Sequence, residues 1–499
     1  MERGFSIVQS ADGGFVIGGT YYSIAPQYDN FYAIKLDSMG NLKWTNSIGG
    51  YMYHHSGSDD GYSITKSYDG GYALVGRTLL YGAGEFDVYV VKLDSSGTRQ
   101  WSKSIGGSNW DQGFSIIQTK DFGYAITGAT ESFGAGSNDV YVIKLDSAGG
   151  IQWTRTIGGA GDDQGYSIIQ TTDRGYAITG FTNSYGAGGY DVYVVKLDSA
   201  GNLQWTKTIG GSKGDDGYSI IQSSDGGYAI TGVTESFNDT IYGDVYVIKL
   251  DSGGNLKWTR TIGDTIGEDI GQSIIQADNG DFVITGYTSS YGAGYDDVYF
   301  IRLDTLGNLL QTRTFGGIEA DYGESIIKTK NKGFAICGFT SELRSPWDDV
   351  FILTLDSLGN NCDSSGRGGK IDSGGIAGSG GSITSYDSGR VETGGSSFSH
   401  GTITNICGTI NSVANIKSIS NNFELSPNPC TNTLNISFET PTNLSSIQIM
   451  DITGRVLLTY DLPLTTNDYP IDVSSISSGM YFIRINSGSG TEVRKFIKE

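Results

Sequence analysis

The sequence predicts an all-β protein, and three observations lead to that prediction. A Gly-aromatic-Ser-Ile motif begins at Gly4 and recurs, in full or altered form, at spacings of 57, 52, 52, 52, 54 and 52 residues. A Lys-Leu-Asp motif, first seen at residues 35–37, recurs at a similar step. The 499 residues include 76 Gly, 31 Tyr and 20 Phe. This composition suits short strands and tight turns, whereas each Gly inside a helix costs roughly 1 kcal/mol against Ala. Both motifs indicate seven repeats.

The fourth repeat shows how each unit is expected to fold. Residues 165–171 and 176–182 are short apolar runs separated by turn residues, and residues 191–198 alternate between the two faces of a strand. Residues 203–209 complete the unit before a Gly-Gly pair. Period-two alternation, β-branched and aromatic residues, and Asp/Gly turns are the signals of strands and hairpins. Each repeat is therefore predicted to be a four-stranded antiparallel sheet.

A single sheet of this size cannot bury both of its faces alone, but seven of them can stack radially on one another. We therefore expect a seven-bladed β-propeller over residues 1–361. The runs DVYVVKLD at 191–198 and GYAITG at 175–180 resemble the units of the bacterial β-propeller repeat family. That resemblance covers about residues 1–360 and implies the same fold.

The last blade is expected to be incomplete. No Trp-bearing strand follows Gly359, and residues 1–3 stand where other repeats carry acidic residues. The simplest interpretation is that the natural chain extends upstream of Met1. That missing segment would supply a closing strand and a signal peptide, whose charged-then-apolar pattern the first residues lack. The alternative is a ring with one three-stranded blade.

Five tryptophans recur at one point of the fourth strand. We expect them to pack between adjacent blades, where a large aromatic side chain buries most area. The functional alternative is a ring of indoles that stack on a ligand. The residues are Trp44, Trp101, Trp153, Trp205 and Trp258.

Charge and hydropathy restrict the partners of the protein. A formal net charge of −21 repels phosphate backbones and anionic lipid headgroups, which argues against nucleic acid or a bare membrane surface as a partner. No apolar run approaches the roughly 18 residues that a membrane-spanning helix needs. Charge and hydropathy both fit an exported protein.

The cysteine and histidine pattern gives one disulfide candidate and no metal site. Cys362 and Cys407 bracket a Gly/Ser-rich tract, and we expect them to pair in an oxidising compartment. Cys337 lies inside a predicted strand and is expected to be a buried thiol. The pair His54-His55 lacks the ligand spacing of a zinc site. No cofactor is predicted, although clustered carboxylates leave calcium possible.

Ligand-binding candidates lie on the face that carries the longer loops, those between the second and third strands and between successive repeats. Carboxylates beside aromatic rings can coordinate calcium or hydrogen-bond sugar hydroxyls while the rings stack on the sugar. Alternatively, the Asp residues bind nearby backbone amides and the rings seal the seams. The candidates are Tyr51, His54, His55, Tyr185, Asp191, Asp215, Asp216, Tyr291, Trp347 and Asp349.

An enzymatic role is the second hypothesis. Two acids at a suitable separation can cleave a glycosidic bond, so a propeller glycoside hydrolase or lyase is conceivable. No acid pair stands apart from the repeat consensus, however, and none of the three His residues lies in a nucleophile motif. We therefore predict no catalytic residue and expect a binding protein. A purely architectural surface protein is the third hypothesis.

The C-terminal part differs in composition. Residues 362–420 are Gly/Ser-rich and are predicted to be a spacer without a large core. Residues 421–499 alternate between apolar and polar residues in short runs, which predicts a small Ig-like β-sandwich. The marked positions of this unit are Pro427, Asn428, Pro429, Asp451, Gly454, Arg455, Gly479, Tyr481, Lys495 and Lys498.

These positions closely resemble the type A C-terminal sorting domain of Bacteroidetes type IX secretion cargo. The motifs Pro-Asn-Pro, Asp-x-x-Gly-Arg and Gly-x-Tyr, and a terminal basic-aromatic segment, occur in that order. Ser426 stands where the family often has Tyr. The resemblance implies recognition by the type IX machinery at the outer membrane, after passage through the periplasm. The mature protein would then be released or attached to the cell surface. We thus expect a secreted or surface propeller that binds an extracellular glycan or protein.

Overall fold

The computed structural model describes most of the repeat region, short segments of the tract that follows it, and most of the C-terminal unit. The described residues are 2–24, 27–49, 59–237, 242–264, 267–341, 348–360, 370–372, 376–378, 382–384, 390–392, 396–398, 404–405, 411–412, 423–451, 456–461, 465–487 and 490–498. The chain divides into two compact units, Met1–Asn415 and Ile416–Glu499.

The first unit consists of seven antiparallel sheets, which we number in chain order. Sheets 1 to 3 contain β1 (Glu2–Gln9), β2 (Phe15–Ile24), β3 (Gln27–Leu36), β4 (Leu42–Gly49), β5 (Asp59–Lys66), β6 (Tyr72–Thr78), β7 (Asp87–Leu93), β8 (Arg99–Gly106), β9 (Asp111–Gln118), β10 (Tyr124–Thr130), β11 (Asp139–Leu145) and β12 (Ile151–Gly158). Sheets 4 to 7 contain β13 (Asp163–Gln170), β14 (Tyr176–Thr182), β15 (Asp191–Leu197), β16 (Leu203–Gly210), β17 (Asp215–Gln222), β18 (Tyr228–Thr234), β19 (Asp244–Leu250), β20 (Leu256–Gly263), β21 (Asp269–Gln276), β22 (Phe282–Thr288), β23 (Asp297–Leu303), β24 (Leu309–Phe315), β25 (Asp321–Lys328), β26 (Phe334–Thr340) and β27 (Asp349–Leu355).

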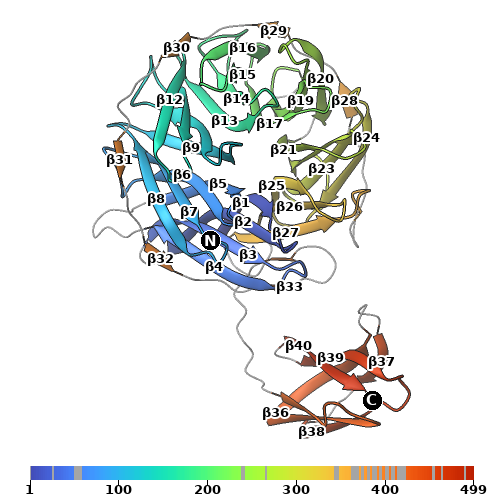
Figure 1. The fold of residues 1–499 in the computed structure, drawn as a ribbon. Helices are drawn as coiled ribbons and strands as arrows, with labels where there is room; N and C mark the ends of the chain where they lie inside the picture. Colours follow the sequence, from blue (N-terminus) through green and yellow to red (C-terminus); the bar gives the residue numbers. More distant parts are fainter. Residues whose placement is uncertain are drawn as a thin grey trace. The chain divides into compact units, whose positions relative to one another are not determined.

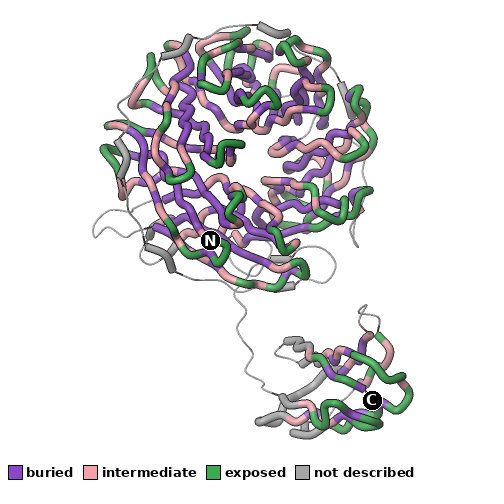
Figure 2. Tube along the Cα trace, viewed as in Figure 1, coloured by how far each residue is buried: buried purple, intermediate pink, exposed green. Residues whose placement is uncertain are grey.

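The sheets pack face to face with their neighbours, and this packing forms the core. Ala125 and Val140 of sheet 3, for example, share an apolar cluster with Ile168 and Tyr176 of sheet 4. Sheet 1 packs in the same way on sheet 7, so β1 contacts β25, β26 and β27. The sheets lie around a common centre (Figure 1), and buried backbone runs through each of them (Figure 2). The predicted all-β fold with repeated four-stranded sheets is therefore confirmed.

The repeated tryptophans lie at the seams between sheets. Trp101 of sheet 2 packs against the apolar cluster that it shares with sheet 3. Gly149, in the turn between β11 and β12, lies directly over the indole, and an added Cβ would come within 3.0 Å of the ring. This glycine also has a φ of +81°, a conformation that favours Gly. The tryptophans therefore serve sheet-to-sheet packing, as the sequence predicts.

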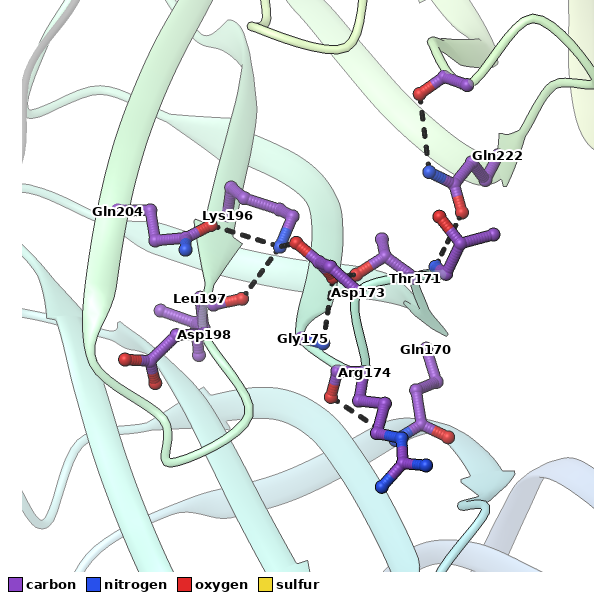
Figure 3. Close-up of polar contacts among 12 residues, drawn as sticks. Gln170, Thr171, Asp173, Arg174, Gly175, Lys196, Leu197, Asp198, Gln204 and Gln222 are labelled. Atoms are coloured by element: carbon purple, nitrogen blue, oxygen red, sulfur yellow. Dashed lines mark hydrogen bonds and ion pairs between the residues drawn. The ribbon is translucent and has the colours of Figure 1, made fainter.

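The Lys of each Lys-Leu-Asp motif is buried and holds the turn between the first two strands of its own sheet (Figure 3). Lys196 Nζ donates to Asp173 Oδ2 at 2.9 Å, to the Leu197 carbonyl at 2.9 Å and to Gln204 Oε1 at 3.1 Å. Burial opposes the ionised form of Asp173, but hydrogen bonds from Thr171 and Lys196 prevail and lower its pKa to about 2. The motif thus ties each turn to the third strand.

Among the described residues, the Gly/Ser-rich tract forms seven short strands, and six of them pair with outer strands of these sheets. The seven strands are β28 (Lys370–Asp372), β29 (Ile376–Gly378), β30 (Ser382–Thr384), β31 (Arg390–Glu392), β32 (Ser396–Phe398), β33 (Thr404–Asn405) and β34 (Asn411–Ser412). The first five pair with β20, β16, β12, β8 and β4, and β34 pairs with both β27 and β33. In sheet 7, β34 therefore lies where other sheets have their fourth strand. The predicted bounds of the spacer, 362–420, stay a prediction.

The second unit is also all-β. It contains β35 (Phe423–Ser426), β36 (Thr433–Met450), β37 (Val456–Asp461), β38 (Thr465–Asp472), β39 (Gly479–Ser487) and β40 (Gly490–Lys498). The first half of β36 pairs with β35 and β38, and its second half pairs with β37 and β39. Leu434, Ile449, Ile483 and Phe496 meet in one buried core.

The remaining expectations concern cysteines and membrane segments. Cys337 is a buried free thiol in β26, as predicted. Cys362 and Cys407, the predicted disulfide pair, lie outside the described residues. Across the described parts of both units, the chain forms no helix of the length and apolarity that a membrane span requires.

Candidate functional site

The first strands of the sheets carry a row of aromatic rings near the centre of the first unit. Phe5, Tyr62, Phe114, Tyr166 and Tyr218 occupy equivalent positions in sheets 1 to 5. Their ring centroids follow one another at 6.1, 5.7, 5.3 and 5.5 Å. Such tilted contacts suit the quadrupoles of aromatic rings. The row forms a continuous half-buried aromatic surface.

Sheets 6 and 7 interrupt this row with Gln272 and Glu324. Burial raises the pKa of the Glu324 carboxyl to about 7, an effect that nearby Arg3 opposes. Burial, reinforced by Asp349, likewise raises the pKa of Glu2 to about 7. The repeat symmetry therefore breaks where sheet 7 meets sheet 1.

A cavity of about 330 Å³ opens beside this break, at the seam between sheets 1 and 2. Its lining comes from the start of the first strands, the end of the second strands and the start of β3. The lining residues are Arg3, Phe5, Thr20, Tyr22, Asp29, Asp60, Tyr62 and Arg77.

Thr20 is one of the smaller residues that line the cavity. The position before the end of the second strand holds Phe181 in sheet 4 and Phe339 in sheet 7, which Thr20 matches in register. Phe181 packs against Tyr166 at 5.6 Å, and Phe339 packs against Phe5 at 6.2 Å. A threonine fills far less volume, and its hydroxyl instead accepts a hydrogen bond from the Gly61 amide at 3.1 Å.

Two arginines are held rigidly at the cavity. Arg3 Nε donates to Asp348 Oδ2 at 2.7 Å, and its guanidinium lies 4.8 Å from the centroid of the Phe339 ring. Arg77 Nε donates to Asp60 Oδ2 at 2.7 Å, and Arg77 Nη1 donates to Gln112 Oε1 at 3.1 Å. Planar guanidinium groups fixed in this way present further N–H donors without a large loss of rotamer entropy.

The cavity therefore combines half-buried aromatic rings with fixed donors and acceptors. Each cation is already paired with a carboxylate, so the polar lining is nearly neutral. Neutral polar lining beside aromatic faces suits a polyhydroxylated ligand, whose hydroxyls exchange hydrogen bonds while its C–H face packs on a ring. Over the described residues, no three His, Cys, Asp or Glu side chains gather as metal ligands.

The predicted candidates Tyr185 and Tyr291 lie at other seams. Their hydroxyls donate to the carbonyls of Gly158 and Gly263, the last residues of the preceding sheets, at 3.0 and 2.9 Å. Their rings pack on the apolar clusters between sheets. The structure does not bring either residue to the cavity, and their part in ligand binding stays a prediction.

The predicted carboxylates shape the loops at the same end of the sheets. Asp191 Oδ2 accepts from the Ala187 amide at 2.8 Å, and burial raises the pKa of Asp191 to about 6. Asp215 Oδ2 accepts from Ser236 Oγ and from the Gly211 amide, both at 2.7 Å. Burial also raises the pKa values of Asp215, Asp216 and Asp349, the last two to about 6. Asp349 lies near Glu2, one residue from the Arg3 partner Asp348.

Four predicted candidates fall outside the described residues, namely Tyr51, His54, His55 and Trp347. Sequence reasoning missed Arg3, Thr20 and Arg77. Comparison of the repeats with one another could have pointed to Thr20 and Arg77. The residue after the second-strand glycine changes from Thr20 to Arg77, Ala129, Phe181, Val233, Tyr287 and Phe339, whereas its neighbours hardly vary.

Several marked residues of the C-terminal unit lie on or beside the last strand, β40. Asn428 Oδ1 accepts from the Ile497 amide at 2.9 Å, so the Pro-Asn-Pro segment is bound to the last strand. The Tyr481 hydroxyl donates to the Ser477 carbonyl at 2.8 Å, and its ring packs on Phe496. Lys495 is exposed, Lys498 is buried, and Gly479 begins β39. Asp451 is described, whereas Gly454 and Arg455 lie outside the described residues.

Residues 424–499 match the family model of the secretion system C-terminal sorting domain. This is an exported protein. The tail implies an interaction with the type IX secretion machinery and delivery to the cell surface or the extracellular space. The predicted sorting domain is thereby confirmed, and the match covers the marked positions from Pro427 to Lys498.

Two further similarities concern other parts of the chain. A stretch is 27% identical over 150 residues to the regulatory protein FlaEY of Caulobacter vibrioides, covering 27% of this chain and 15% of that protein. The solved BSP domain of a biofilm associated protein aligns over 99% of this chain and 96% of its own at 10% identity. Its TM-score of 0.13 is too low to support an argument about the fold.

Proposed function

We propose that the repeat unit of this exported protein is a seven-bladed β-propeller that binds an extracellular glycan in the cavity between sheets 1 and 2. The propeller fold is supported by seven similar sheets and by the packing of sheet 1 on sheet 7. For the C-terminal unit we propose a small Ig-like β-sandwich, which delivers the propeller to the outside of the cell.

One observation carries the glycan assignment. At the seam where Thr20 replaces a bulky residue, the cavity exposes aromatic rings between two guanidinium–carboxylate pairs. A sugar ring can pack on Phe5 or Tyr62 while Arg77 and Asp60 exchange hydrogen bonds with its hydroxyls. Because Asp60 and Asp348 pair with the two arginines and Asp29 adds a further carboxylate, the cavity has no excess positive charge and favours a neutral over an anionic sugar.

The experiment is a glycan array probed with the purified full chain, followed by calorimetric titration of the best ligand. The variant Thr20→Phe introduces the residue that sheets 4 and 7 carry at this position, so we expect it to fold and to fill the cavity. Binding should weaken by about tenfold or more, since the ligand loses its packing surface. Tyr62→Ala should weaken binding similarly by removing the ring.

Tyr287→Phe is the matched control, because it places phenylalanine at the equivalent position of sheet 6, away from the cavity. It should leave affinity unchanged. The proposal fails if Thr20→Phe binds the array ligand as tightly as the unsubstituted chain. It also fails if the full chain binds no glycan.

A further inference from the structure

The opposite end of the sheets carries a second set of loops, the tight turns between first and second strands. Glutamine side chains link these turns from sheet to sheet. Gln118 Oε1 accepts from the Tyr68 amide of sheet 2 at 2.6 Å, and Gln170 Oε1 accepts from the Lys120 amide of sheet 3 at 2.9 Å. Gln170 Nε2 also donates to the carbonyl of Arg174 at 3.3 Å. The turns of neighbouring sheets are therefore held at fixed positions.

In three of these turns, those of sheets 3, 4 and 7, a residue other than glycine has a positive φ. Phe122 in sheet 3 has a φ of +68°, and Arg174 in sheet 4 has a φ of +67°. The equivalent residue in sheets 1, 2, 5 and 6 is a glycine with positive φ. Residues other than glycine are disfavoured in this conformation, and such residues cluster at functional positions. The fold alone does not require a large side chain here.

The Phe122 side chain extends an exposed aromatic surface. Its ring is 57% exposed and lies 5.1 Å from the ring of Tyr68 in sheet 2, which is 65% exposed. No equivalent aromatic pair occurs in the corresponding turns of the other repeats, because those positions are not aromatic there. The apolar surface is therefore particular to sheets 2 and 3.

Three exposed cations flank the pair. Lys66 ends β5 beside Tyr68, Lys120 is two residues from Phe122, and Arg174 follows in sheet 4. Throughout the described residues, none of the three forms an ion pair. The acids Asp121 and Asp173 of the same turns are instead bound by buried lysines. Figure 3 shows the pair of Asp173 and Lys196. No carboxylate of the described residues therefore holds any of these three cations in an ion pair.

The lysines at the same end of sheet 7 differ in this respect. Lys328 pairs with Asp278 at 2.9 Å, and Lys330 Nζ donates to the Ala11 carbonyl at 2.5 Å. Lys332 has a φ of +64° like Arg174, but the neighbouring repeat places no aromatic pair beside it. Among the described turns between first and second strands, exposed cations and exposed rings coincide only over sheets 2 to 4.

We propose that Lys66, Tyr68, Lys120, Phe122 and Arg174 form a docking surface for an acidic polysaccharide, separate from the cavity at the other end of the sheets. Carboxylate or sulfate groups of the polymer pair with the cations, and its sugar rings pack against Tyr68 and Phe122. Arginine can bind a carboxylate through two parallel N–H donors. The five residues belong to the turns of sheets 2, 3 and 4, so one polymer chain would contact all three sheets. Gln118 and Gln170 link these turns and keep the contacting side chains at fixed positions.

Charge complementarity favours this partner although the whole chain carries a net charge of −21. A local patch of unpaired cations attracts an anionic chain over about one Debye length, roughly 10 Å at 0.1 M salt. Two half-exposed rings on rigid turns offer a sugar a stacking surface, but they provide little apolar area for insertion into a lipid bilayer. Export brings the surface into contact with extracellular polymers.

The test measures binding of the full chain to alginate, a polyuronate, and to chondroitin sulfate by biolayer interferometry, with neutral dextran and anionic phosphatidylglycerol vesicles in parallel. We expect binding to at least one acidic polymer, no binding to dextran or vesicles, and a loss of about tenfold between about 50 and 300 mM salt. The double variant Phe122→Gly, Arg174→Gly should weaken binding by about tenfold or more. Because both positions have positive φ, glycine keeps the turns intact.

Lys332→Gly is the matched control, since it removes a cation from the same backbone conformation in sheet 7. It should bind like the unsubstituted chain, and so should the cavity variant Thr20→Phe. The proposal is overturned if neither acidic polymer binds, if the double variant binds normally, or if vesicles bind in place of the polymers. If Thr20→Phe loses the array ligand but still binds the acidic polymers, the cavity and the docking surface are separate sites. Each proposal can therefore be refuted without the other.

Discussion

The buried lysine of each repeat leads to an asymmetric prediction for Lys196 and Asp173. Lys196 is 3% exposed and Asp173 is 55% exposed in their side chains. Replacing Asp173 by Asn leaves a buried ammonium without its counter-ion, whereas replacing Lys196 by Met leaves a carboxylate that water can solvate. We therefore expect the loss of the acid to be the more destabilising of the two changes.

The magnitudes follow from the contacts. A hydrogen bond to a charged group contributes about 1.5–3 kcal/mol, and Lys196 keeps the Leu197 carbonyl and Gln204 Oε1 as acceptors, so Asp173→Asn should cost about 2 kcal/mol. Removing a buried charge also removes its desolvation cost, so Lys196→Met should cost about 1 kcal/mol or less. In the double variant, the two effects should not add.

The assay is urea denaturation of the purified chain, followed by tryptophan fluorescence, for the single variants and the double variant. Arg174→Met serves as the control, because it removes an exposed cation from the same turn. It should change the free energy of unfolding by no more than about 0.5 kcal/mol. If Lys196→Met destabilises the protein more than Asp173→Asn does, the buried ammonium does not depend on Asp173 and the reasoning is wrong.

Three further predictions concern acids, a seam and the tail. Burial raises the pKa values of Asp139 and Asp191 to about 6, above the value of about 3.9 in unfolded chains. Between pH values of about 4 and 6 the folded state therefore binds more protons than the unfolded state, and the free energy of unfolding falls as the pH rises through this range. A urea midpoint at pH 7.5 that equals or exceeds the midpoint at about pH 5 would contradict this prediction. Gly149→Ala should lower the free energy of unfolding by about 1–2 kcal/mol, because alanine is disfavoured at a positive φ and its Cβ would press on the Trp101 ring. A variant with unchanged thermal stability would refute this prediction. Deleting residues 424–499 should retain the protein inside the cell, as measured by fractionation and immunoblotting, and continued surface display would show that export uses another signal.

Much of the fold could be predicted because local signals repeat. The alternation in 191–198, the Asp/Gly turns and the recurring tryptophans each specify a strand, a hairpin or a seam contact, and the structure has them at those residues. The pairing of residues 370–412 with the outer strands was not predictable in this way. Backbone pairing of short Gly/Ser-rich segments leaves almost no side-chain pattern in the sequence.

The candidate site was harder to predict, because it depends on differences between repeats. The Asp and Tyr residues that nearly every repeat shares are conspicuous in the sequence, but Asp191 binds a loop amide and Tyr185 binds the carbonyl of a neighbouring sheet. The cavity instead lies beside Thr20, which is small where Phe181 is large. The two arginines, Arg3 and Arg77, lie on adjacent sheets at different register positions, so the sequence alone does not show that they line one cavity.

The register at that variable position has a consequence for how new specificities can arise. Side chains as different as threonine, arginine, alanine, phenylalanine, valine and tyrosine occupy it without shifting the strand pairing. One exchange at this point can therefore open or close a hollow between two sheets while the other seams stay unchanged. Variation at this position therefore changes the lining of one seam and leaves the hydrogen-bond ladder of the sheet in place.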